Sequence, residues 1–197
     1  MQTKNIFNAL LKKGDGIIKA SDALQAGIPK SSFRYYADKF NLEKIAYGVY
    51  RSNDAWDDGM YLLQARFSKA IFSHQCALYL LGLSDREPLQ YTVTVKTNYN
   101  YAGLAKEGVK VHSVKEEWLE IGLTTLQSLT GRSLQVYNAE RTICDIIRRR
   151  KSIEIQDFQT AMKLYAERKN KDLPLLLRYA QTFRVEKTLR QYLEVLL

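Results

Sequence analysis

The first 51 residues divide into short segments of changing pattern, and this spacing constrains the fold more than any other feature of the chain. Four apolar residues fall on one face of a predicted first helix that ends at Lys12-Lys13-Gly14: Ile6, Phe7, Leu10 and Leu11. Residues 16–20 are too few for a helix and predict a small strand. Ser21 is placed to cap a short second helix, which Gly27 ends.

A third helix is predicted to begin at Pro29, whose missing N–H costs nothing in a first helical turn, and to run to about Lys39. Its large apolar side chains gather in one narrow arc and form a core face: Phe33, Tyr36, Ala37 and Phe40. The other side chains point away from that face: Ser31, Ser32, Arg34, Tyr35 and Lys39. This outer face is free to meet a ligand.

Two strand-like runs, residues 42–45 and 49–51, follow around Ala46-Tyr47-Gly48, a loop of hairpin length. Helix, strand, helix, turn, helix and hairpin in this order is typical of a winged helix-turn-helix, whose third helix usually enters the major groove of DNA. We therefore predict a DNA-binding domain over residues 1–53, an acidic link at 53–58, and a second domain over 59–197.

The second domain is predicted to be mixed α/β and to end in helices, which makes the whole chain α+β. Helices are expected at 60–68 and 75–81, and strands at 91–95, 109–111, within 119–126 and at 134–136. Asn138 is the expected cap of a helix that closes at Arg148-Arg149-Arg150, and three further helices are expected at 155–168, 173–183 and 185–196.

The net charge of +9 favours contact with a polyanion, and its distribution is uneven. Residues 1–50 hold 8 Lys/Arg against 4 Asp/Glu, residues 51–147 hold 10 against 11, and residues 148–197 hold 12 against 6. The excess therefore lies at the two ends. No run of about 18 apolar residues suggests a membrane span, and the two cysteines, Cys76 and Cys144, are expected to be reduced core thiols, so we expect a soluble cytoplasmic protein.

The basic residues near the third helix are the candidate DNA contacts. Arg34 can reach a guanine edge or a phosphate, Ser31 and Ser32 can donate to phosphate, and Tyr35 can contact sugar or base, while Lys30 and Lys39 add charge. Lys44, Tyr47 and Arg51 are the candidate contacts from the hairpin. Two alternatives stay open: the helix face is only solvated, and the hairpin tyrosines only pack on the helix. The Arg148–Lys151 run is explained by a cation-rich helix end or by a phosphate or protein contact.

Enzymatic sites are not supported by the sequence. A restriction-type nuclease needs a carboxylate two positions before Lys96, where this chain has Thr94, and Asp85 and Glu87 precede the strand. His74 and Cys76 supply two of the four ligands that a structural zinc site needs, and no glycine-rich phosphate loop is present. We therefore expect no catalytic residue, no metal and no cofactor.

The chain resembles the AbiEi antitoxins of abortive-infection (phage-defence) toxin–antitoxin systems over nearly all of its 197 residues. The segment GIIKASDALQAGIPKSSFRYYADKFNLEKIAYGVYRS is similar to that family's winged helix. Three further places agree: Ser73–Leu78, Val136-Tyr137 with Glu140-Arg141-Thr142, and Tyr179-Ala180 with Tyr192–Glu194.

The resemblance implies an antitoxin that represses its own operon by binding inverted repeats in the promoter. We expect a monomer in solution, with two copies bound at each operator. It also implies a C-terminal domain that counters a nucleotidyltransferase-like toxin without a stable complex. By position, DNA contacts would come from Ser31, Ser32, Arg34, Tyr35 and Lys44, and Glu140, Arg141 and Asp145 would fall in the antitoxin segment. Alternatively, Arg141 and Asp145 form an ordinary i, i+4 pair, and the protein is a winged-helix regulator with no toxin.

Overall fold

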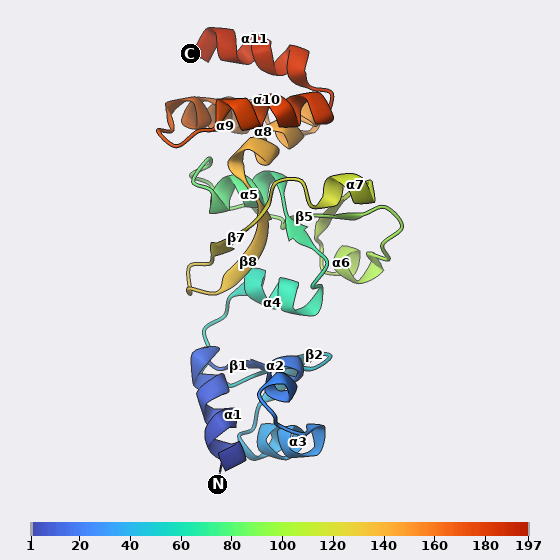
Figure 1. Cartoon of the computed structure of the whole chain (residues 1–197), viewed down its shortest axis with the longest axis vertical. Coiled ribbons are helices and arrows are strands. Elements are labelled where there is room, and N and C mark those ends of the chain that lie inside the picture. The colour runs from blue at the N-terminus through green and yellow to red at the C-terminus, as the bar shows by residue number, and fades with distance from the viewer. Residues whose placement is uncertain (1, 197) are drawn as a thin grey trace. The chain divides into compact units, whose positions relative to one another are not determined.

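Helices and strands occur together in both parts of the chain, as the computed structural model shows for residues 2–196 (Figure 1). The chain divides into two units, each with its own contacts. The first unit contains the residues up to Ser68 together with Gln127–Ser133, and the second contains Lys69–Leu126 together with the residues from Leu134 onward. This mixed composition confirms the predicted α+β class.

The first unit follows the predicted order of elements. Its helices and strands are α1 (Gln2–Lys13), β1 (Ile17–Lys19), α2 (Ala20–Gln25), α3 (Lys30–Lys39), β2 (Glu43–Ala46), β3 (Val49–Arg51) and α4 (Gly59–Arg66). The three strands form one antiparallel sheet in the order β1-β3-β2, in which Ile18 lies opposite Tyr50 and Lys44 lies opposite the same residue on the other side. The hairpin formed by β2 and β3 is therefore tied to the strand that precedes α2.

The aromatic core of this unit is built around Phe7 of α1, which is completely buried. Its ring lies 5.6 Å from that of Phe33, 5.4 Å from that of Tyr36 and 5.7 Å from that of Phe40, between ring centroids. Aromatic pairs at such distances add to the stability that burial provides. The face of α3 that was predicted to be apolar thus packs against α1.

Two helix starts in the first unit differ from the prediction. Ser21 does not cap α2: the N-cap is Lys19, which makes no side-chain cap bond, and the hydroxyl of Ser21 donates to Asp22 Oδ1 instead. Pro29 is the N-cap of α3 in an extended conformation, so the first helical residue is Lys30. The preceding β1 strand runs directly into α2, which leaves no separate capping position for Ser21.

The first unit extends beyond the boundary expected at residues 53–59. Asp58 caps α4 by accepting from the Tyr61 N–H at 2.9 Å, and its other carboxylate oxygen accepts from the hydroxyls of Ser128 and Thr130. Arg132 donates to the Asp15 carbonyl at 2.9 Å and lies over the Tyr61 ring. A buried carboxylate and a buried guanidinium each need partners. Residues 127–133 supply those of Asp58, and the N-terminal part of the unit supplies those of Arg132.

The second unit is a five-stranded mixed sheet with helices. Its elements are β4 (Ile71–Phe72), α5 (His74–Leu80), β5 (Thr92–Lys96), α6 (Ala102–Lys106), β6 (Lys110–Val114), α7 (Glu116–Leu119), β7 (Leu123–Gln127), β8 (Ser133–Tyr137), α8 (Ala139–Arg148), the 3-10 helix η1 (Arg150–Ser152), α9 (Ile155–Glu167), α10 (Leu173–Thr182) and α11 (Glu186–Leu196). The strand order is β6-β5-β4-β8-β7, with β4 antiparallel to β5 and parallel to β8, and β5 parallel to β6.

The predicted helices and strands of the second unit are confirmed to within a few residues, with one exception. The strand expected within 119–126 occupies only the second half of that range, because Leu119 ends α7 and Gly122, at φ +78°, turns the chain before β7 begins at Leu123. A Cβ at Gly122 would also meet the Arg141 side chain at 2.5 Å, so only glycine fits there. The sequence prediction missed β4, α6 and α7, which are too short to show a period.

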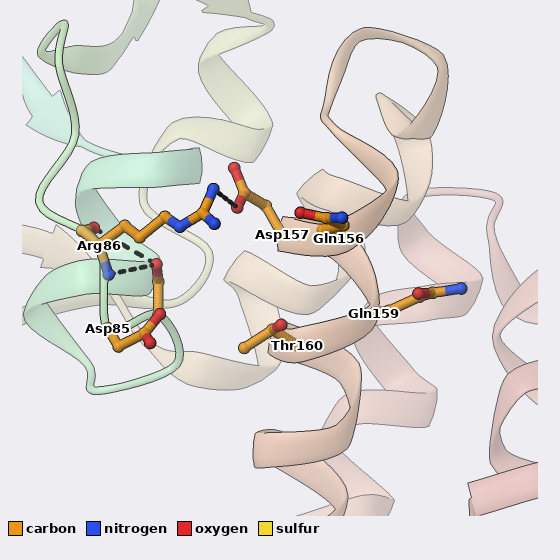
Figure 2. Close-up of a pocket in the computed structure, with 7 residues that line it drawn as sticks. Asp85, Arg86, Gln156, Asp157, Gln159 and Thr160 are labelled. Carbon is orange, nitrogen blue, oxygen red and sulfur yellow. Dashed lines mark hydrogen bonds and ion pairs between the residues drawn. The ribbon is translucent and has the colours of Figure 1, made fainter.

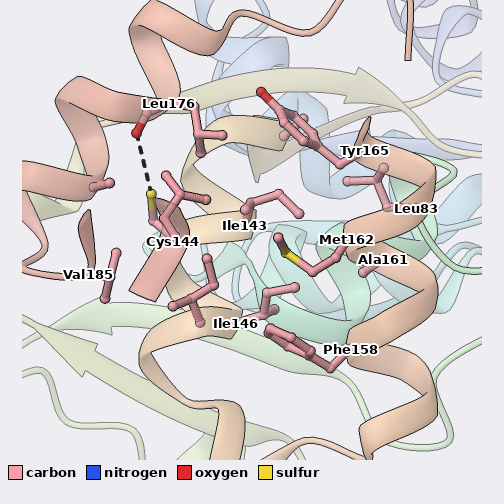
Figure 3. Packing of buried hydrophobic residues seen from close by; sticks show 14 of the residues in the cluster. Leu83, Ile143, Cys144, Ile146, Phe158, Ala161, Met162, Tyr165, Leu176 and Val185 are labelled. Carbon is pink, nitrogen blue, oxygen red and sulfur yellow. Dashed lines mark hydrogen bonds between the residues drawn. The ribbon is translucent and has the colours of Figure 1, made fainter. Parts of the chain in front are cut away.

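Helix α8 is the centre of the apolar core of the second unit (Figure 3). All nine residues from Ala139 to Ile147 are buried, and α9, α10 and α11 pack around them. Ile143, Ile146, Phe158 and Met162 meet in this core. The predicted cap is confirmed, because the Asn138 side chain accepts from the Arg141 N–H at 2.9 Å.

Candidate nucleic-acid interface

The predicted division of α3 into a core face and an outer face is confirmed. Phe33 and Ala37 are buried, and Tyr36 and Phe40 are partly buried against α1. On the opposite side Ser32 is partly buried, and five candidate contact residues are exposed: Lys30, Ser31, Arg34, Tyr35 and Lys39. Helix α3 therefore presents a polar surface with three cations to solvent.

Tyr35 and Lys39 form a pair on the outer face of α3. The Lys39 ammonium donates to the Tyr35 hydroxyl at 3.4 Å and lies 5.5 Å from the centre of its ring. The Tyr35 ring in turn meets the edge of Tyr36, whose ring reaches the core. An exposed cation–π contact contributes little stability, so its consequence is geometric: it holds an aromatic ring and a positive charge together at the surface.

The tip of the hairpin carries an exposed tyrosine. Tyr47 is 96 % exposed, and the Lys44 ammonium lies 6.0 Å from its ring centre. Tyr50, not Tyr47, is the hairpin tyrosine that packs on α3, with its ring 5.2 Å from that of Phe33. The two alternatives that the sequence left open therefore apply to different tyrosines. Tyr50 anchors the hairpin on α3, and Tyr47 extends from the hairpin.

Arg51 has different partners from those expected of a DNA contact. Its guanidinium makes an ion pair with Glu43 at 2.8 Å across the hairpin and lies 3.6 Å from Asp57. Two carboxylates neutralise the positive charge that a phosphate would have to meet. This ion pair links β2 to β3. Arg51 is therefore a weaker candidate for a DNA contact than Lys44.

An open hollow of about 690 Å³ lies between α2, α3 and the hairpin. Its charged lining residues are four cations and one carboxylate: Lys19, Lys30, Arg34, Lys44 and Asp22. Tyr47 and Gly48 also line it. The outer face of α3 and the hairpin thus flank one concave surface with a strong positive excess, as a site for a polyanionic backbone requires.

The three residues expected in the antitoxin segment lie in the interior of the second unit. Glu140 and Asp145 are almost fully buried, and Arg141 is completely so. Glu140 Oε1 accepts from the Tyr165 hydroxyl at 3.1 Å and from the Asp172 N–H at 3.2 Å, so it joins α8 to α9 and to the start of α10. Burial, with the nearby Glu140 carboxylate, raises the pKa of Tyr165, which keeps this hydroxyl a donor.

The residues that the sequence analysis weighed for a nuclease or a metal site lie apart or have structural partners. Thr94 is buried and donates to Ser73 Oγ, and Lys96 pairs with Glu116 at 3.3 Å. Asp85 lies beside a hollow of about 300 Å³, where Arg86 faces Asp157 at 3.9 Å (Figure 2). Within residues 2–196, no three His, Cys, Asp or Glu side chains are arranged to hold a metal ion. Both cysteines are free and buried, and burial raises their pKa.

The sequence prediction missed one close pair. The rings of His74 and His112 are stacked, with centroids 3.8 Å apart and planes inclined by 27°. Each histidine is isolated in the sequence. The parallel register of β5 and β6 puts Thr94 opposite His112 and so brings the His112 ring close to His74. The residues around either histidine do not predict that register.

Comparisons with known proteins address the fold. No protein-family model and no curated protein matches the chain. Among solved structures, the crystal structure of the RV2827C protein from Mycobacterium tuberculosis is similar, with a TM-score of 0.52 at 13% sequence identity, over 98% of this chain and 80% of that one. The likeness extends over both units and concerns the fold alone.

No helix in the described residues combines the length and apolar character that crossing a membrane takes.

Proposed function

We propose that the first unit is a winged helix that binds double-stranded DNA, with α3 as its recognition helix and the β2–β3 hairpin as its wing. The observation that carries the proposal is the concave surface with four cations between α3 and the hairpin tip. A helix whose core face is fixed by Phe7 presents its outer residues in one row, and DNA recognition by such units needs a row of this kind in the major groove.

The exposed residues divide into two roles. Lys30, Lys44 and Ser31 fit contacts to phosphate, because they flank the hollow or the start of α3, where their charge or hydroxyl can meet the DNA backbone. Arg34 fits direct readout, since its guanidinium matches the two acceptors on a guanine edge and it is exposed in the middle of α3. Tyr47 at the hairpin tip fits a contact to the sugar–phosphate backbone or the minor groove.

We further propose that the protein is an AbiEi-type antitoxin that represses its own promoter at inverted repeats and counters a nucleotidyltransferase-like toxin through its second unit. This part rests on the family resemblance. The burial of Glu140, Arg141 and Asp145 assigns them to the stability of that unit, so a toxin-opposing surface would have to come from other residues. The protein then works in the cytoplasm and has no enzymatic activity.

The test is a binding titration of the purified protein against its own promoter fragment and a scrambled fragment, each at two salt concentrations. Arg34→Ala is the test variant, and Arg178→Ala, an exposed arginine of the second unit, is the matched control. We expect the wild type and the control to prefer the promoter and Arg34→Ala to lose that preference, because Arg34 is the proposed base contact. The two salt concentrations separate specific from non-specific binding, since non-specific affinity falls steeply with salt. Equal affinity of the wild type for both fragments would refute autoregulation.

A further inference from the structure

The outer face of α3 carries one carboxylate among its cations. Asp38 is the only acidic residue of this helix, and it is exposed. At about 100° per residue, its side chain leaves the helix about 20° from that of Ser31, about 40° from that of Arg34 and about 140° from that of the buried Phe33. Asp38 therefore lies near the middle of the face that the proposed recognition helix turns toward DNA.

The fold gives this carboxylate no stabilising partner. Within residues 2–196, no hydrogen bond or ion pair involves the Asp38 side chain, and the neighbouring Lys39 ammonium donates to Tyr35 instead. Asp38 lies in the last turn of α3, where the helix dipole disfavours a negative charge. Arg34 lies four positions before it, which is the weaker order for an ion pair on a helix. The side chain thus adds no stability, and its role is sought in what α3 binds.

Asp38 also opposes the binding of a phosphate backbone. The exposed cations of α3 are Lys30, Arg34 and Lys39, and the carboxylate offsets one of these three charges. Affinity for DNA of any sequence rises with the number of cations that meet phosphates. A carboxylate on this face therefore lowers non-specific affinity, and DNA compensates for it only where a base offers a hydrogen-bond donor.

The base edges in the major groove differ in what they offer a carboxylate. Cytosine presents its N4 amino group, which donates, and no acceptor. Guanine presents two acceptors and thymine presents one, so both repel a carboxylate. Adenine presents a donor beside an acceptor, which suits an amide better than a carboxylate. Among the four bases, cytosine is thus the one that fits Asp38.

The spacing along α3 relates this base to the guanine proposed for Arg34. Four residues of a helix span about 6 Å along its axis, and successive base pairs are about 3.4 Å apart. A helix that lies along the groove therefore brings Arg34 and Asp38 to base pairs about two steps apart. The two side chains can then read two different base pairs of one half-site.

We infer that Asp38 is a specificity-determining residue of α3, which accepts a hydrogen bond from the N4 amino group of a cytosine about two base pairs from the guanine that Arg34 contacts. It rejects guanine and thymine at that position and weakens binding to unrelated DNA. The inference rests on the proposed binding of DNA by the first unit and adds to it the base that this residue reads. Neither the family resemblance nor the fold comparison assigns it.

The test is a base-by-base substitution scan of one promoter repeat, with binding titrations of the full-length wild type, Arg34→Ala and Asp38→Ala at one salt concentration. We expect the wild type to lose about tenfold in affinity or more when one particular cytosine becomes thymine or guanine. Asp38→Ala should reduce this loss to less than about threefold and keep the discrimination at the Arg34 guanine. It should also bind the scrambled fragment more tightly than the wild type does, because it removes a negative charge from the DNA-facing surface.

Two further measurements separate the reading of cytosine from a general effect of charge. Asp38→Asn should prefer adenine to cytosine at the same position, because an amide matches the donor and the acceptor of adenine. N4-methylcytosine at that position keeps its pair with guanine but blocks the amino group, so it should weaken binding by the wild type and not by Asp38→Ala. The matched control Asp85→Asn removes the same charge from an exposed residue of the second unit and should behave as the wild type does throughout.

The outcomes distinguish this inference from the proposal on which it rests. Equal affinity of the wild type for promoter and scrambled fragments refutes DNA recognition by the first unit, and the reading by Asp38 with it. If the wild type prefers the promoter and Arg34→Ala loses that preference, but Asp38→Ala keeps full discrimination at every cytosine, the reading by Asp38 alone is refuted. It is also overturned if Asp38→Ala loses discrimination only at the Arg34 guanine, since Asp38 would then position Arg34 and read no base.

Discussion

Arg141 Nε donates to Asp145 Oδ2 at 2.9 Å inside the second unit, where Arg141 is completely buried and Asp145 almost completely. The guanidinium lies between two rings, 4.3 Å from the centre of Tyr137 and 4.1 Å from that of Phe183. Its Nη1 donates to the carbonyls of Trp118 and Ile121. One residue of α8 thus joins this helix to β8, to α7 with the turn after it, and to the end of α10. Burial raises the pKa of Asp145, while the ion pair lowers it.

Removing Arg141 should destabilise the second unit strongly. Arg141→Ala leaves the Asp145 carboxylate buried without its cation and two carbonyls without a donor, and breaking such a pair typically costs about 3–5 kcal/mol. The free energy of unfolding, measured by urea denaturation, should fall by about that amount. The exposed control Arg178→Ala should change it by less than about 0.5 kcal/mol. A loss below about 1 kcal/mol for Arg141→Ala would contradict this structural role.

Acid should destabilise the protein through the histidine pair. Burial, Arg149 and Lys110 lower the pKa of His112 to about 4, and burial is also the main cause that lowers that of His74. Below about pH 6.5 the unfolded chain binds protons at both rings while the folded chain does not. Unfolding then takes up protons, so stability is lost as the pH falls from about 6.5 toward 4.

The measurement is urea denaturation at several pH values for the wild type and for His112→Gln. The variant should show a flatter dependence of the unfolding free energy on pH between about 6.5 and 4, because one of the two imidazoles is gone. Lys106→Gln, an exposed change in the same unit, should keep the wild-type slope. An identical slope for His112→Gln and the wild type would show that His112 does not contribute to the acid sensitivity.

Lys44 should act on DNA affinity without acting on sequence preference. It lines the cationic hollow beside Tyr47 and reads no base in the proposed arrangement. Each phosphate contact contributes about −0.9 to the slope of log K against log salt concentration. Lys44→Gln should therefore make this slope shallower by about 0.9, the value of one contact, on promoter and scrambled fragments alike. Lys106→Gln is the control. A loss confined to the promoter would instead make Lys44 a specificity residue.

The faces of α3 could be predicted from the sequence because they depend on a local period. Phe33 and Ala37 recur at helical spacing, and any helix at this place would bury them together. The same holds for the cap at Asn138, since capping involves residues three apart. Ser21 had the right residue type for a cap, but the strand β1 that enters α2 directly removed the position.

The remaining features depend on contacts between distant segments. Asp58 and Arg132 meet partners 70 or more residues away, which moves the division between the two units. The stacking of His74 on His112 depends on the register of β5 and β6. A strand register is set by the whole sheet and not by the few residues on either side, so neither relationship leaves a trace in the local pattern.

The two proposed activities should separate at Arg34. The residue is exposed on α3 and belongs to the first unit, whereas protection against the toxin is proposed for the second. Arg34→Ala, expressed from a foreign promoter in cells that carry the toxin, should protect as well as the wild type while failing to repress the native promoter in a reporter assay. Arg141→Ala should fail to protect, because unfolding of the second unit removes the surface that would oppose the toxin. If Arg34→Ala alone abolishes protection at normal protein abundance, DNA binding and toxin neutralisation are one activity. If no toxin gene lies beside this one, the antitoxin proposal fails and the alternative of a winged-helix regulator without a toxin is the one to test.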